Sequence, residues 1–169
     1  MRVPNDLEFD TETYLLFSIY YEAYGPFEVM DESAATYVKR FEKQIRGTGQ
    51  VLEWLGLAIP DKNSPLGCKP SHDLVSLIAK PHKPSKSKKS CPSAEDDEVF
   101  DMILDAAVGE LEEESSIASC VAKVLTALGL MVRGRDYDYI PTKRLRKLAC
   151  ERHQEERNQR NEERWLKSA

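Results

Sequence analysis

The chain has 169 residues, of which 41% are hydrophobic and 31% are charged, and its formal net charge is -5. This length suffices for one ordinary domain or two very small ones, and the hydrophobic fraction suffices for a core. Mean hydropathy is -0.53, and the longest apolar run, Tyr14 to Tyr21, is far shorter than the roughly 20 residues of a membrane span. These values argue against a membrane-spanning protein.

The N-terminal residues and the cysteines both favour the cytoplasm. Residues 1–13 lack the apolar core and the cleavage site of a signal peptide. The cysteines lie far apart and form no CxxC pair, a pattern typical of a reducing compartment. We therefore expect a cytoplasmic protein without disulfides. The cysteines are Cys68, Cys91, Cys120 and Cys150.

An aromatic helix is predicted near the N-terminus. About fourteen residues from Asp10 carry apolar side chains on nearly all faces, and a Gly-Pro pair ends the run. Such a helix is typical of an element wedged between others or between subunits. We expect Tyr14, Phe17 and Tyr21 to be buried against the rest of the chain or against a second copy.

A segment rich in Lys, Pro and Ser divides the chain. Residues 80–92 contain five lysines, three prolines and three serines, a composition typical of a linker. On either side the chain repeats itself. Residues 51–57, VLEWLGL, share Val, Leu, Leu, Gly and Leu with residues 124–130, VLTALGL. Further on, residues 69–77 match residues 140–148, each with Pro, then Ser or Thr, then two leucines.

Each repeat predicts a helix, a β-hairpin and a closing helix. Gly56 and Gly129 can end the first helix, since glycine adopts the left-handed conformation of a C-terminal cap. A short apolar segment, a turn-rich stretch and a return segment then indicate a hairpin. Ser71 and Thr142 supply a hydroxyl that caps the closing helix. Trp54 is predicted to pack against the N-terminal aromatic helix or, alternatively, to be exposed as a partner anchor.

The predicted fold class is therefore mainly α with short β-hairpins (α+β). In the charged C-terminal segment, alternating charges indicate a solvated helix held by i,i+4 pairs such as Glu156 with Arg160. The predicted segments are an N-terminal helix (1–30), a first half (31–79), a linker (80–94), a second half (95–150) and a charged C-terminal helix or tail (151–169).

The order of elements resembles the winged helix-turn-helix superfamily. The match is best from Ser115 to Thr142, where a Ser-capped helix ends in Leu-Gly-Leu and leads into a hairpin with an Arg-Gly-Arg tip. The resemblance covers roughly 100 residues and implies two winged-helix-like halves. By this resemblance the Ser-capped helix is the recognition helix and the hairpin is the wing. Two helices should precede the recognition helix, and residues 96–108 and 110–114 are the candidates for them.

The resemblance implies that the second half binds DNA through cations and hydroxyl groups. Cations neutralise phosphates, and serine hydroxyls donate to phosphates or base edges. The acidic run 110–114 opposes this role because carboxylates repel a phosphate backbone. The candidate nucleic-acid-binding residues are Ser116, Ser119, Lys123, Arg133, Arg135, Lys143, Arg144 and Lys147, with Arg146 in the same basic run.

No motif for catalysis, a cofactor or a metal stands out. The glycines form no phosphate-binding loop, and Cys68 with His72 lacks further zinc ligands at usable spacing. We therefore expect a non-enzymatic DNA-binding protein without cofactor or metal, used in transcription regulation. The alternative is a protein-interaction module, in which the winged-helix surfaces and the N-terminal helix bind another chain or a second copy. In that case the acidic segment 95–114 would dock on a basic partner.

Overall fold

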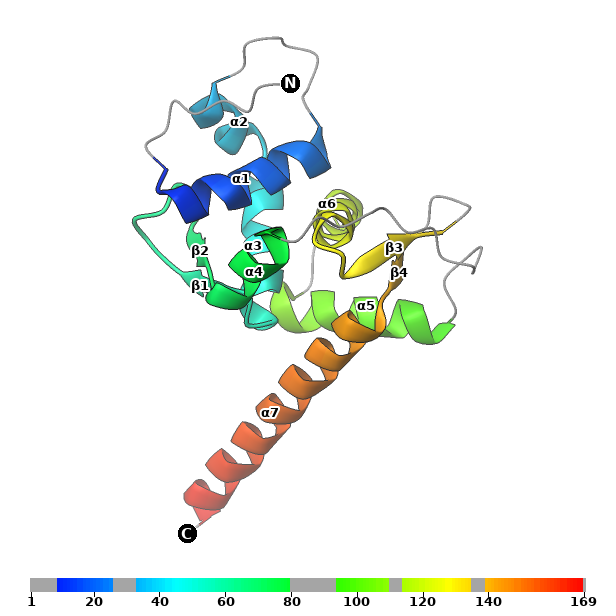
Figure 1. Cartoon of the computed structure of the whole chain (residues 1–169). Helices are drawn as coiled ribbons and strands as arrows, with labels where there is room; N and C mark the ends of the chain where they lie inside the picture. Colours follow the sequence, from blue (N-terminus) through cyan, green and yellow to red (C-terminus); the bar gives the residue numbers. More distant parts are fainter. Residues whose placement is uncertain (1–8, 26–32, 80–93, 110–113, 135–138, 169) are drawn as a thin grey trace.

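The computed structural model describes residues 9–25, 33–79, 94–109, 114–134 and 139–168 (Figure 1). These residues are mainly helical and include two small antiparallel hairpins, which confirms the predicted fold class at this level. The helices are α1 (Thr11–Tyr24), α2 (Ala34–Arg40), α3 (Glu42–Trp54), α4 (His72–Ala79), α5 (Ala94–Ala107), α6 (Glu114–Ala127) and α7 (Lys143–Ser168). The hairpins pair β1 (Ala58–Pro60) with β2 (Cys68–Pro70) and β3 (Met131–Arg133) with β4 (Tyr139–Pro141).

The sequence repeat reappears in the backbone hydrogen bonds. Gly56 and Gly129 have φ values of 76° and 75°, and they follow α3 and α6 as predicted. The leucine after each glycine donates its amide to the carbonyl five residues earlier, at 2.8 Å in both halves. Ser71 and Thr142 cap α4 and α7, each accepting an amide hydrogen bond from three residues later at 3.3 Å. Each half therefore has the predicted order of helix, hairpin and helix.

The boundaries around the second half differ slightly from those predicted. Helix α6 begins at Glu114, so Ser115 lies inside the helix rather than at its cap. Helix α5 begins at Ala94, the last residue of the predicted linker. The rest of that linker and residues 110–113, where a second preceding helix was predicted, lie outside the described residues.

A single hydrophobic core runs through both halves. Its buried residues come from all seven described helices, α1 to α7, and from the hairpins between them. Helix α6 of the second half packs against α1 and against α3 of the first half. The α3–α6 contact is so close that a Cβ added to Gly47 would lie 2.6 Å from Cγ2 of Ile117. The two halves are therefore interlocked through their helices.

Helix α1 forms as predicted from its cap and its aromatic residues. The Asp10 carboxylate accepts a hydrogen bond of 2.7 Å from the Thr13 amide, and the helix continues for 14 residues. Phe17 is fully buried, whereas Tyr14 and Tyr21 are half-buried. The predicted burial is thus confirmed for Phe17 and only partial for the two tyrosines.

Helix α7 is continuous across the predicted boundary between residues 150 and 151, and its second part extends away from the body (Figure 1). Trp54 is buried, and its indole Nε1–H donates to the Glu156 carboxylate at 2.8 Å. The alternative of an exposed Trp54 anchor is therefore wrong. Among the ion pairs of the described residues, none joins Glu156 to Arg160. The buried indole N–H needs an acceptor, and Glu156 supplies it.

Candidate nucleic-acid interface

Helix α6 presents a narrow polar stripe. Its apolar face is buried against α1 and α3 and includes Val121, Val124 and Leu125. Ser116 and Ser119 are exposed and Lys123 is half-buried, and their i, i+3, i+7 spacing places them on one face. The structure therefore brings these three predicted residues together.

The hairpin after α6 adds one described cation. Arg133 is the last residue of β3 and is exposed, and β3 packs against α6. Its partner in the antiparallel register is Tyr139. Arg135, predicted at the tip of the hairpin, lies outside the described residues.

The first turns of α7 carry the remaining candidates. The Thr142 hydroxyl donates to the Leu130 carbonyl at 2.8 Å, which fixes the start of α7 beside the end of α6. Lys143, Arg144 and Lys147 follow, and all three are exposed. The Lys147 ammonium lies 4.0 Å from a Glu151 carboxylate oxygen one turn further along, an exposed pair that contributes little to stability.

Arg146 differs from its neighbours in the basic run because it serves the fold. Its guanidinium forms ion pairs with Asp96 and, at 3.6 Å, with Glu95 of α5. The Asp96 side chain is 0% exposed, so this pair joins α5 to α7 beneath the surface. A buried carboxylate must be paired, which removes Arg146 from the cations that a ligand could use.

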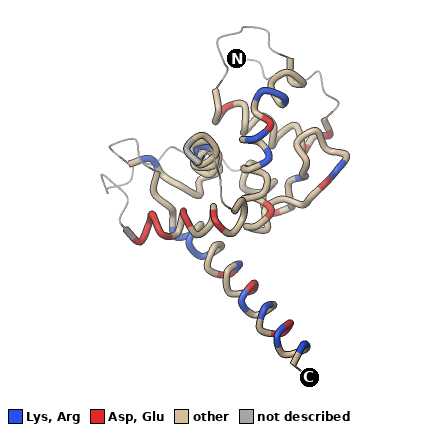
Figure 2. The backbone as a smooth tube through the Cα atoms, turned by 180° about the vertical axis from the view of Figure 1, so that it is seen from behind, with Lys and Arg blue, Asp and Glu red and all other residues tan. Residues whose placement is uncertain are grey.

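An acidic stripe on α5 borders this surface. Asp97, Glu98, Asp101 and Asp105 are exposed, and their spacing places them on one face of the helix. Helix α5 packs against β4 and α7, and Figure 2 shows its Asp and Glu residues where it crosses the basic start of α7. Sequence reasoning assigned the opposing charge to residues 110–114, although the spacing of the α5 carboxylates was visible in the sequence. Any polyanion that binds at the start of α7 lies close to this stripe.

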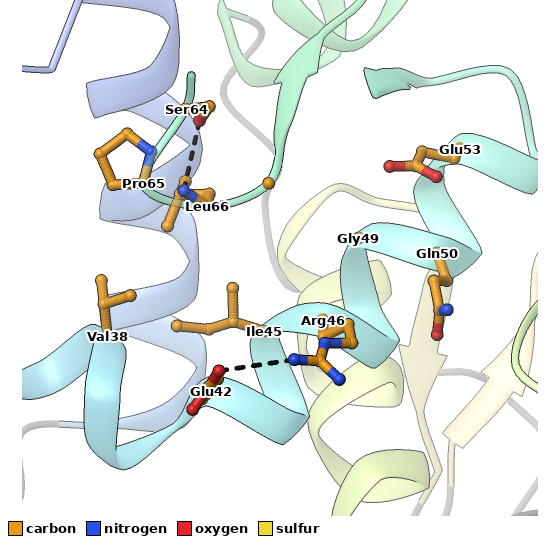
Figure 3. A pocket seen from close by; sticks show the side chains of 11 residues that line it. Val38, Glu42, Ile45, Arg46, Gly49, Gln50, Glu53, Ser64, Pro65 and Leu66 are labelled. Carbon is orange, nitrogen blue, oxygen red and sulfur yellow. Dashed lines mark hydrogen bonds and ion pairs between the residues drawn. The ribbon is translucent and has the colours of Figure 1, made fainter. Parts of the chain in front are cut away.

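A separate groove lies between α3 and the β1–β2 loop (Figure 3). It has a volume of about 410 Å³, and the Arg46 guanidinium donates to Glu42 at 3.4 Å on one side of it. Burial raises the pKa of Glu53, which lines the other end. Among the lining residues Ser64 carries a hydroxyl, which accepts a hydrogen bond from the Leu66 amide at 3.2 Å. The lining residues include no base placed to activate that hydroxyl as a nucleophile.

The thiol beneath this groove is equally unsuited to catalysis. Burial, together with the negative charge of Glu53, raises the pKa of Cys68 to about 11. Thiolate is the nucleophilic form of cysteine, and very little of it exists at neutral pH with such a pKa. Gly49 lies directly over the sulfur, since a Cβ added there would be 3.5 Å from Sγ. Cys68 is therefore a core residue.

Across the described ranges, no group of three His, Cys, Asp or Glu side chains is arranged to hold a metal ion. In that part of the chain, no helix combines the length and the apolar character needed to cross a bilayer. No protein-family model, curated protein or solved structure matches the chain.

Proposed function

We propose that this chain is a non-enzymatic DNA-binding protein of winged-helix type, which acts through its second half in transcription regulation. The observation that carries the proposal is the polar stripe of Ser116, Ser119 and Lys123, opposite the buried apolar face of α6. Strand β3 of the hairpin packs against the same helix, and the Thr142 hydroxyl bonds the cationic start of α7 to Leu130 in the turn after it. The hydroxyls of α6 and the cations of α6, the β3–β4 hairpin and the start of α7 are thereby held by elements that pack or bond to one another.

The chemistry of this surface suits contacts to phosphates better than contacts to bases. Lys123 and Arg133 supply positive charge for the backbone, whereas the two serines offer small hydroxyl donors. The major groove admits an α-helix, but the stripe on α6 is only one residue wide and the apolar face of the helix is buried in the core. We therefore expect binding that depends strongly on salt and weakly on sequence.

The proposal is tested with Lys123→Gln and Arg133→Gln against Lys62→Gln as control. Lys62 is an exposed cation in the turn of the β1–β2 hairpin, the counterpart of the second hairpin in the first half. Fluorescence anisotropy with a labelled mixed-sequence duplex is measured over a salt series. Each site variant should reduce the slope of log K against log salt by about 0.9 per lost phosphate contact. Lys62→Gln should leave it unchanged.

Two results would contradict the proposal. One is a wild-type protein that binds no mixed duplex at low salt, where electrostatic binding is strongest. The other is a slope that stays the same in both site variants.

A protein-interaction module is the second candidate, and the α5 acidic stripe favours it. Its carboxylates are exposed and would suit a basic partner. Helix α1 gives less support, because Phe17 and Tyr20 are buried within the chain itself. The variant Asp97→Asn/Asp101→Asn/Asp105→Asn separates the candidates. It should strengthen duplex binding if the chain binds DNA, and it should abolish binding of a poly-L-lysine probe if α5 is the docking surface.

A further inference from the structure

Beyond Glu156, α7 runs free of the rest of the described protein (Figure 1). The hydrogen bond from Trp54 to Glu156 is, among the described residues, the bond nearest the C-terminus that joins α7 to another element. Every residue from Arg157 to Ser168 is exposed. At 1.5 Å per residue this part of the helix is about 18 Å long. It is therefore open to a ligand from all sides.

One face of this projecting part is basic. Arg157, Arg160 and Arg164 follow an i, i+3, i+7 spacing and form what we call the arginine stripe. Together with Asn161 they line a shallow depression of about 220 Å³. Among the described residues, no carboxylate forms an ion pair with any of these arginines. Their charge is thus available to a ligand.

Three of the five carboxylates of α7 gather on the opposite side. At about 100° per residue, Glu151, Glu155 and Glu162 centre about half a turn away from the arginine stripe. Glu151 and Glu155 pair with Lys147 and Arg152, at 4.0 Å and 3.3 Å, and not with the stripe. These three carboxylates therefore form an acidic face opposite the arginine stripe, whereas Glu156 and Glu163 flank the stripe about a quarter of a turn from its centre.

We propose that the arginine stripe is a second nucleic-acid contact, which lies along one phosphate backbone. Guanidinium groups bind phosphates through paired hydrogen bonds and keep their charge at all relevant pH values. The stripe contains no apolar residue, whereas the core of a protein interface requires some. A symmetric dimer through this face would bring arginines against arginines. The acidic face opposes insertion into a groove, because phosphates border a groove on both sides.

The arginine stripe is distinct from the surface around α6. Lys143 and Lys147 lie about a quarter of a turn away around α7 and roughly 20 Å from Arg160 along it. One straight duplex segment therefore does not lie along the arginine stripe and along Lys143 and Lys147 with the same orientation. The inference rests on the proposed function for its class of ligand, but it places a contact on different residues.

The test compares two triple variants of the full chain. Arg157→Gln/Arg160→Gln/Arg164→Gln removes the arginine stripe, and Glu151→Gln/Glu155→Gln/Glu162→Gln removes the same number of charges from the acidic face. Binding of the labelled mixed duplex is measured over a salt series, and circular dichroism checks that α7 remains helical. The arginine variant should lose up to about 2.7 units of salt slope, at 0.9 per contact. The glutamate variant should bind as well as wild type or better.

A third variant, Arg157→Lys/Arg160→Lys/Arg164→Lys, keeps the charge and should retain most of the slope. An unchanged slope in the arginine-to-glutamine variant overturns the inference, even where Lys123→Gln and Arg133→Gln weaken binding and so support the proposed function. If instead the arginine-to-glutamine variant loses slope while Lys123→Gln and Arg133→Gln do not, the arginine stripe is a contact and the α6 surface is not. A wild-type protein that binds poly-L-glutamate through the arginine stripe but binds no duplex overturns both.

Discussion

Replacing Gly47 by alanine tests the close contact that interlocks the two halves. In a helix interior, Gly→Ala ordinarily stabilises a protein by about 0.5–1 kcal/mol. Here the new Cβ would lie 2.6 Å from Cγ2 of Ile117, well inside the 3.5–4.0 Å of a favourable carbon contact. Isoleucine is fixed at χ1 in a helix, so the clash must be relieved by moving α3 from α6.

Overpacking of this kind costs about 1–3 kcal/mol, which exceeds the gain in helix propensity. We therefore expect Gly47→Ala to lower the free energy of unfolding by about 1–2 kcal/mol. The melting temperature should fall by roughly 2–8 °C for a chain of this size. Denaturant unfolding and calorimetry measure both quantities.

Gly49→Ala is the matched control, two residues further along the same helix. Its added Cβ meets Cys68 Sγ at 3.5 Å, an ordinary contact, so this variant should be stabilised by up to about 1 kcal/mol. Ile117→Ala removes the clashing methyl group, and the double variant with Gly47→Ala should be more stable than the two single effects predict. A Gly47→Ala protein as stable as Gly49→Ala would refute the interlocked packing.

Three further variants or modifications probe the core. Arg146→Ala should lower the free energy of unfolding in urea by about 3–5 kcal/mol, because it removes the guanidinium that pairs with the fully buried Asp96 carboxylate; an unchanged midpoint would contradict the α5–α7 pair. Burial raises the pKa of Glu53, so its ionised form costs stability above that pKa, and Glu53→Gln should raise the melting temperature at pH 7. The gain should shrink toward pH 4, where the unfolded carboxyl is also protonated; a constant gain would exclude this cause. With a pKa of about 11, buried Cys68 should resist a thiol reagent at pH 8 while exposed Cys150 reacts, and peptide mapping of native protein with modified Cys68 would disprove it.

The features that could be predicted from sequence depend on near neighbours in the chain. Gly56 and Gly129 end helices because glycine permits a positive φ, and Ser71 and Thr142 cap helices through an amide three residues away. The hairpins follow from short apolar segments on either side of turn residues. Each of these signals lies within a few residues of the structure that it specifies.

The features that could not be predicted join residues far apart in sequence. Trp54 and Glu156 are separated by 102 positions, and nothing local shows that the indole needs this carboxylate. Likewise, Arg146 appeared as one surface cation among several until α5 placed Asp96 beneath it. The spacing of the arginine stripe and of Glu151, Glu155 and Glu162 was visible in the sequence, but the two sets lie on opposite sides only because the segment is one continuous helix.

The interlocked core also constrains how the chain folds as it leaves the ribosome. Helix α1 is synthesised about 90 residues before α6, so at 5–20 residues per second it waits roughly 5–20 s for the helix that covers it. During that interval the side of α1 that packs against α6 has no cover from the second half. A nascent chain arrested before α6 thus presents a hydrophobic helix of the kind that chaperones bind, and stable packing of the first half awaits the emergence of the second.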